Sequence, residues 1–80
     1  MIVAVEVSDT TFADDLRKVA EYAEVGIPQA WIVDVRRRRV VVHSDPVRAE
    51  RRYAAVTSVS SGSLELAGTT ITIDEIFPQM

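Results

Sequence analysis

Glu6 is the strongest candidate for a catalytic or metal-binding residue in this sequence, because it is a carboxylate inside an apolar run. The run extends from Ile2 to Val7 and is β-branched at most positions. Strict alternation along a strand would place Glu6 on the same face as Ile2 and Ala4. A buried carboxylate is unfavourable unless it is paired, protonated or bound to a metal ion. Glu6 is therefore a candidate metal ligand. The alternative is a strand-end glutamate that is solvated or hydrogen-bonded to backbone N–H groups.

A second candidate group is a run of four arginines, Arg36, Arg37, Arg38 and Arg39. These side chains could contact phosphate groups. Residues 36–52 hold seven arginines against two acids, a sum of +5, whereas residues 1–35 hold seven acids against two basic residues, a sum of −5. The whole chain carries −3, which argues against strong nonspecific binding of nucleic acid. We favour a solvated turn whose charges deter edge-to-edge strand pairing.

The composition excludes several classes of site. The chain has no cysteine, and its single histidine, His43, has no second histidine with which to build a zinc site, so an ordinary strand-end role is predicted. Eighty residues allow one domain at most, of marginal stability unless it is oligomeric. The apolar start lacks the features of a secretory signal and is too short to span a bilayer. We expect a cytoplasmic protein without a membrane partner.

The first half of the chain is typical of a strand–helix–strand unit. The continuous apolar run at residues 2–7 predicts a buried strand of a sheet covered on both faces. A helix is predicted from about residue 12 to 25, with Thr11 and Asp14 as a capping box and Gly26 as the C-terminal cap. Its predicted apolar stripe consists of Phe12, Leu16, Val19 and Ala23. A second buried strand at residues 30–35 completes a βαβ unit with parallel strands.

The second half is predicted to be antiparallel. Residues 36–39 form a turn and residues 40–43 a returning strand, which Ser44, Asp45 and Pro46 interrupt. A third antiparallel strand follows at residues 51–57, then a Ser/Gly loop at residues 58–63. Short strands are expected around residues 64–66 and 70–73, with a helical turn at residues 74–77. The predicted class is α/β, in the mixed α+β sense: a mixed sheet with one main helix.

Three segments together resemble the Uma-type family of putative restriction endonucleases, which have a PD-(D/E)XK nuclease-like fold. The first is Val3-Ala-Val-Glu6-Val-Ser8, similar to the family's apolar-apolar-Glu-Val strand followed by Ser. The second runs from Lys18 through Tyr22, Gly26-Ile-Pro28 and Trp31-Ile-Val-Asp34, in the order and spacing of the family signature. The third is the arginine hairpin, the Tyr53 strand and the closing Asp-Glu-Ile-Phe. The resemblance covers essentially the whole chain.

The resemblance implies that Glu6 is a catalytic residue and helps hold Mg²⁺ or Mn²⁺, which polarises a phosphodiester and lowers the pKa of the attacking water. It also implies that Lys18 supplies the motif's lysine from the helix, because Ser8 stands where the in-strand lysine would be. A helical projection at about 100° per residue puts Lys18 off the apolar stripe. The alternative is a surface lysine that pairs with Asp14 and Glu21.

The remaining family positions have simpler interpretations. Ser8 and Asp9 either begin the helix, which we favour, or lie at the mouth of a site. Tyr22, Trp31 and Asp34 suggest core packing and strand-end hydrogen bonding more than catalysis.

Family members are more than twice as long, and their upstream half supplies further catalytic carboxylates. We therefore expect residues 1–80 to form a single truncated domain, the C-terminal half of a restriction-endonuclease-like fold. The expected function is that of a Mg²⁺-dependent DNA endonuclease, incomplete and weak or inactive alone. The alternatives are a catalytically silent assembly module and a nucleic-acid-binding fragment. We also expect a homo-oligomer, because the apolar strand from Ile2 to Val7 would lie exposed along one edge.

Overall fold

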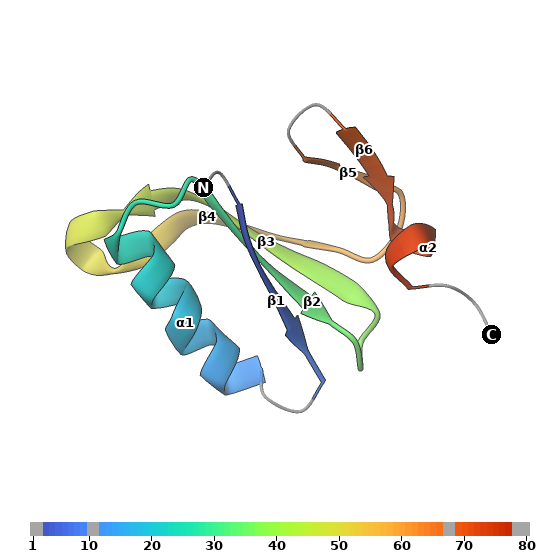
Figure 1. The fold of residues 1–80 in the computed structure, drawn as a ribbon, viewed down its shortest axis with the longest axis horizontal. Helices are drawn as coiled ribbons and strands as arrows, with labels where there is room; N and C mark the ends of the chain where they lie inside the picture. The colour runs from blue at the N-terminus through green and yellow to red at the C-terminus, as the bar shows by residue number, and fades with distance from the viewer. Residues whose placement is uncertain (1–2, 10–11, 67–68, 78–80) are drawn as a thin grey trace.

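The computed structural model describes residues 3–9, 12–66 and 69–77. Its main body is a four-stranded sheet of order β1-β2-β3-β4, crossed by one long helix (Figure 1). The elements of this body are β1 (Val3–Ser8), α1 (Phe12–Glu24), β2 (Gln29–Asp34), β3 (Arg39–Val47) and β4 (Arg52–Val59). Strands β1 and β2 are parallel, whereas β3 and β4 follow antiparallel, as the sequence predicts. The fold is thus a mixed α+β arrangement that starts with a βαβ-like unit.

Helix α1 ends at Glu24, one residue before the end predicted from the sequence. Gly26 adopts a left-handed conformation with φ of 81°, and its N–H donates to the carbonyl of Ala23. A side chain at this position would be strained, and glycine avoids that strain. Thr11, the predicted N-cap, lies outside the described residues.

The predicted break at residues 44–46 is wrong. Strand β3 continues through these residues to Val47, although Asp45 has a left-handed φ of 58°. The pairing of β3 with β2 ends at Ser44, so Pro46 is paired with β4 alone. Proline is tolerated in a strand where no neighbour needs its missing N–H, which explains why the chain does not turn away here.

A 3₁₀ turn, Arg48–Glu50, then leads into β4. Strand β4 ends two residues later than predicted, so the Ser/Gly loop begins at residue 60.

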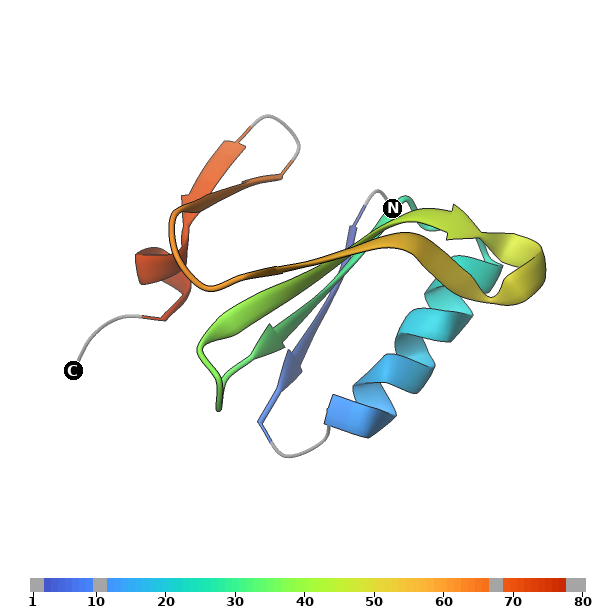
Figure 2. The same ribbon diagram turned by 180° about the vertical axis from the view of Figure 1, so that it is seen from behind.

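The C-terminal part forms a separate two-stranded sheet and does not join the main one. Strands β5 (Ser63–Leu66) and β6 (Thr69–Thr72) pair antiparallel, and the short helix α2 (Ile73–Ile76) follows. Thr72 and Glu75 cap α2 through a reciprocal capping box. Figures 1 and 2 show this hairpin and α2 on the opposite side of the main sheet from α1.

The side of α1 that faces the sheet is rotated relative to the predicted apolar stripe. Val19 and Ala23 are buried against Ile32 and Tyr53 in one core cluster, as expected. Leu16, however, is 42% exposed, whereas Asp15 is only 4% exposed. The helix therefore turns the side that carries Asp15 and Val19 toward the sheet, and this brings polar groups of α1 next to β1.

The other face of the sheet is covered only in part. Trp31 and Val40 pack there with Leu64, Ile73 and Phe77 from the C-terminal part. This cover does not bury the far part of β1, because Val5 is 50% exposed and Val7 is 68% exposed. The expectation of a first strand buried on both faces is therefore wrong. Strand β1 is buried on its α1 face and open on the other.

Along the chain segments that the structure describes, none of the helices has the length and apolarity needed to cross a membrane.

Candidate active site between β1 and α1

Glu6 lies on the face of β1 that α1 covers, and both of its carboxylate oxygens have partners from α1. The Tyr22 hydroxyl donates a hydrogen bond to Oε1 of Glu6. The ammonium nitrogen of Lys18 lies 3.6 Å from Oε2. The Glu6 side chain is 20% exposed, so it is neither solvated like a surface residue nor isolated in the core. The structure thus brings together Glu6 and Lys18, the two residues that the sequence singles out for catalysis.

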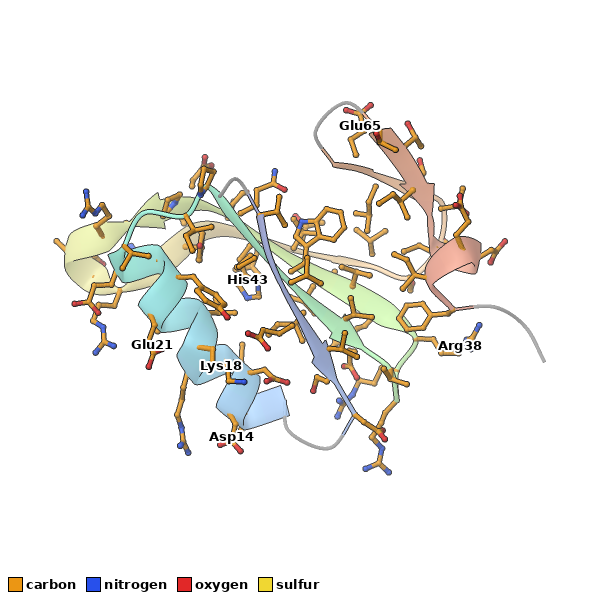
Figure 3. All side chains as sticks on the ribbon, in the orientation of Figure 1. Asp14, Lys18, Glu21, Arg38, His43 and Glu65 are labelled. Atoms are coloured by element: carbon orange, nitrogen blue, oxygen red, sulfur yellow. The ribbon has the colours of Figure 1, made fainter. Side chains whose placement is uncertain are left out.

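Lys18 lies between two carboxylates. Besides Glu6, it pairs with Asp15 at 3.9 Å, three residues earlier on α1. The sequence-based alternative paired Lys18 with Asp14, but Asp14 is bound by Arg17 at 3.5 Å. Figure 3 shows Lys18 on the side of α1 that faces β1. The rotation of the helix explains this correction, because the same turn that buries Asp15 aims Lys18 at the strand.

Tyr22 belongs to this cluster, although the sequence suggested only a packing role. Its pKa is raised to about 12, chiefly because its hydroxyl donates to the Glu6 carboxylate, with burial and the nearby negative charges of Glu6, Glu21 and Asp15 adding to the effect. One signal in the sequence could have revealed it. Tyr22 stands four residues after Lys18, and residues at that spacing lie on the same helical face. Asp15, three residues before Lys18, could have been found in the same way.

Ser8 follows Glu6 on the same face of β1 and ends the strand. It is fully buried, and its Oγ is the buried side-chain polar atom that has no hydrogen-bond partner within the described part of the chain. Its carbonyl accepts a hydrogen bond from the N–H of Val35 at 2.8 Å. Ser8 therefore lies at the end of the strand, beside the site, and does not begin the helix.

The arginine turn is held by the chain's own groups. Asp34, at the end of β2, is 1% exposed and accepts hydrogen bonds from Nε of Arg39 at 3.0 Å and from the backbone and side chain of Arg37 at 3.3 Å. Burial alone would raise the pKa of Asp34, but these hydrogen bonds and the charge of Arg37 outweigh it and lower the pKa below its ordinary value. The strand-end hydrogen bonding expected of Asp34 is confirmed.

Arg38 connects this turn to the C-terminal helix. Its Nη2 donates to the carbonyl of Phe77 at 2.6 Å, and its guanidinium lies 5.5 Å from the centre of the Phe77 ring. Further arginines also have internal partners: Arg48 donates to the Glu24 carbonyl at 3.1 Å, and Arg51 pairs with the Glu24 side chain at 2.8 Å. Much of the positive charge is therefore engaged within the fold.

His43 is a core residue and not a strand-end residue, because β3 continues past it. It is 6% exposed, its Nδ1 lies 3.1 Å from the carbonyl of Ala30, and its ring contacts that of Tyr53 edge to face. Burial lowers the pKa of His43, against the opposing effect of its backbone hydrogen bonds. A histidine packed in this way supports the fold.

Comparison with known families shows the family of this chain. The family model Uma2, described as putative restriction endonuclease, matches residues 1–78. The chain belongs to the Uma2 family. Comparisons with curated proteins and with solved structures gave no match. Membership of the Uma2 family agrees with the resemblance carried by Glu6, Lys18 and the Tyr22 to Asp34 segment, and it describes a nuclease-like domain.

A restriction-endonuclease-like family implies a divalent metal ion, and the described residues supply only part of a site for one. Glu6 has the hard oxygen ligands that Mg²⁺ prefers, and both oxygens already have partners on α1, the Tyr22 hydroxyl at Oε1 and the Lys18 ammonium at Oε2. No group of three or more His, Cys, Asp or Glu side chains is arranged to hold a metal ion in residues 3–9, 12–66 and 69–77. A complete metal centre would need ligands from elsewhere.

Proposed function

We propose that this Uma2 domain takes part in Mg²⁺- or Mn²⁺-dependent hydrolysis of phosphodiester bonds in DNA, with Glu6 and Lys18 as its catalytic residues. The observation that carries the proposal is the contact between these two side chains. They come from different elements, β1 and α1, and approach to 3.6 Å. A carboxylate and a lysine held together in this way are the pair that the PD-(D/E)XK nuclease chemistry requires.

In this proposal Glu6 is the metal ligand, and a bound Mg²⁺ would polarise the phosphodiester and activate water. Lys18 has three N–H donors, and its ammonium lies 3.6 Å from Glu6 and 3.9 Å from Asp15, at ion-pair distances. In the proposal this ammonium orients a water molecule or stabilises the negative charge that develops on the phosphate. The buried hydroxyl of Ser8, which has no partner among the described residues, adds a polar group at the same end of β1.

We further propose that the domain is the C-terminal half of a PD-(D/E)XK site and acts weakly or not at all alone. The described residues place two carboxylates in this cluster, Glu6 and Asp15, and they hold no group of three or more His, Cys, Asp or Glu side chains arranged to bind a metal ion. The missing ligands would come from another segment or another chain, placed next to β1.

The edge of β1 is the surface through which we propose that two copies associate. Strand β1 is the first strand of the sheet and pairs only with β2 among the described strands, so its outer backbone groups are open. Val5 and Val7 are exposed on the face away from α1. Two β1 strands paired antiparallel about a two-fold axis would join the valines on one face. On the other face, the same pairing would bring the two Glu6 carboxylates together, and each copy would supply a ligand that the other lacks.

DNA would approach at the end of the sheet where β1 and β2 finish. Open sheets commonly bind ligands at the carboxyl ends of parallel strands. Ser8 pairs with Asp34 in the strand register, so the arginine turn follows at the same end of the sheet as Glu6. We propose that Arg36, Arg37, Arg38 and Arg39 contact the phosphate backbone. DNA as substrate agrees with the cytoplasmic location expected from the sequence.

Plasmid nicking by the purified chain with Mg²⁺ or Mn²⁺ tests the proposal. Glu6→Gln and Lys18→Met are compared with Glu21→Gln and Arg17→Met, which change the same chemistry at nearby helical positions. We expect nicking to fall about 100- to 1000-fold in the first two variants and to persist in the second two. Equal activity in all five proteins would identify a contaminant and reject the assignment.

A catalytically silent assembly module is the second candidate. The internal pairing of both Glu6 oxygens and the open edge of β1 favour it. No nicking by any of the five proteins, together with self-association of the wild-type chain, would select this alternative.

A further inference from the structure

Two donors from one helix share the two oxygens of Glu6. Tyr22 binds Oε1 and Lys18 binds Oε2. The two donors stand four residues apart on α1, so they lie one above the other on the same helical face. Each oxygen of the carboxylate therefore has its own partner on α1.

Two partners matter because the terminal torsion angle of a glutamate side chain has a broad distribution. Rotation of the carboxyl group about its last bond has no sharply defined minimum, so a single partner leaves the plane of the oxygens free. Of the two partners, Lys18 is the less restrained, with a side chain that is 54% exposed. Tyr22 has a rigid ring that packs against the core cluster of Val19, Ala23 and Ile32.

We infer that Tyr22 is a positioning residue that fixes the carboxylate of Glu6, so that Oε1 is held by the helix and Oε2 faces Lys18. Its significance for catalysis rests on the proposed function, but the contact itself does not. Removal of a residue that orients a metal ligand commonly reduces metal affinity or activity by about 10- to 100-fold. Tyr22 contacts Glu6 and no reacting group, so its effect on the reaction would pass through Glu6.

Titration of the two tyrosines tests the contact without DNA or metal. The chain has two tyrosines, Tyr22 and Tyr53, and NMR of protein labelled at the tyrosine ring carbons resolves both in the intact sequence. Glu6→Gln replaces the charge with a neutral group of the same shape. The pKa of Tyr22 is expected to fall from about 12 toward its ordinary value of 10.0. The pKa of Tyr53 is raised by its own burial and should not move.

Circular dichroism recorded over the same pH range separates titration from alkaline unfolding, which would shift both tyrosines together. A Tyr22 pKa that is ordinary in the wild-type chain, or one that Glu6→Gln leaves unchanged, would overturn the inference. A fall confined to Tyr22 would support it.

The consequence for catalysis is tested with Tyr22→Phe, which removes only the hydroxyl. We expect the Mg²⁺ concentration for half-maximal nicking to rise about 10- to 100-fold, with the helix content unchanged. Tyr53→Phe is the matched control, because its hydroxyl binds the backbone carbonyl of Ile27 and not the site. It should lower stability and leave the Mg²⁺ dependence in place.

The tyrosine titration and the Mg²⁺ dependence of nicking distinguish failure of the positioning inference from failure of the proposed function. An unchanged Mg²⁺ dependence in Tyr22→Phe, in a chain that nicks DNA, would overturn the positioning role. A wild-type chain that nicks no DNA is the outcome expected of an incomplete site acting alone, and the tyrosine titration would then decide the positioning inference.

Discussion

The ammonium nitrogen of Lys18 lies 3.6 Å from Oε2 of Glu6, so a helix and a strand separated by a loop contribute to one charged pair. The position of α1 that achieves this leaves Leu16 42% exposed and buries Asp15. The helix therefore exposes part of its apolar surface while it holds polar groups against β1. Departures from simple apolar patterning of this kind are expected at functional sites.

Lys18→Met should separate activity from stability. The side chain of Lys18 is 54% exposed, so its ion pairs with Glu6 and Asp15 are screened by water and contribute little to folding. We expect the free energy of unfolding, measured by urea denaturation, to change by less than about 1 kcal/mol while nicking is lost. A large loss of stability would mean that Lys18 acts mainly as a structural counter-ion.

Asp34 should make the stability of the domain fall in acid. Its pKa is lower in the folded chain than its ordinary value of 3.8, so the folded state prefers the ionised form. Its stabilising contribution is complete above that ordinary value, and it is lost as the pH falls through the lower, folded-state pKa. Asp34→Asn should cost about 1–3 kcal/mol at neutral pH, because Arg37 and Arg39 lose a buried partner. Urea denaturation at several pH values should show the variant and the wild type converging in acid.

Val7→Lys should weaken association of two copies if they meet at the edge of β1. Val7 is 68% exposed on this edge strand, and a lysine there deters pairing with another strand. Val25→Lys is the control, because Val25 is similarly exposed at 66% but follows the helix. Sedimentation should show a dimer for the wild type and the control, and a monomer for Val7→Lys. A wild-type chain that stays monomeric at high concentration would contradict the proposed interface.

Arg36 and Arg38 should have different roles within the same turn. Arg38→Ala removes the hydrogen bond to the Phe77 carbonyl and the contact with its ring, so it should lower the free energy of unfolding by about 1 kcal/mol. Arg36→Ala should leave stability in place and reduce the salt dependence of DNA binding by about one counterion. Thermal unfolding and fluorescence anisotropy with a DNA duplex measure the two effects. An unchanged salt slope in Arg36→Ala would remove this residue from the phosphate contact.

The sequence by itself determined the order of the elements. The apolar strands, the helix ending at Gly26 and the antiparallel second half depend on local patterns and caps, which act over a few residues. It also identified Glu6, because a carboxylate in an apolar strand stands out without any knowledge of its neighbours. The break predicted at Ser44, Asp45 and Pro46 misled this local reasoning, and with it the strand-end interpretation of His43, since tolerance of a proline in a strand depends on whether a neighbouring strand needs its N–H.

Only the tertiary structure decided which face of α1 meets the sheet, and that choice created the site. The rotation of a helix depends on how side chains of several segments pack together, and the apolar pattern of α1 alone would have turned Leu16 inward. The packing against β1 instead brought Asp15, Lys18 and Tyr22 to Glu6. The same physical reason explains the exposed face of β1, because cover from β5, β6 and α2 depends on where a distant part of the chain comes to lie.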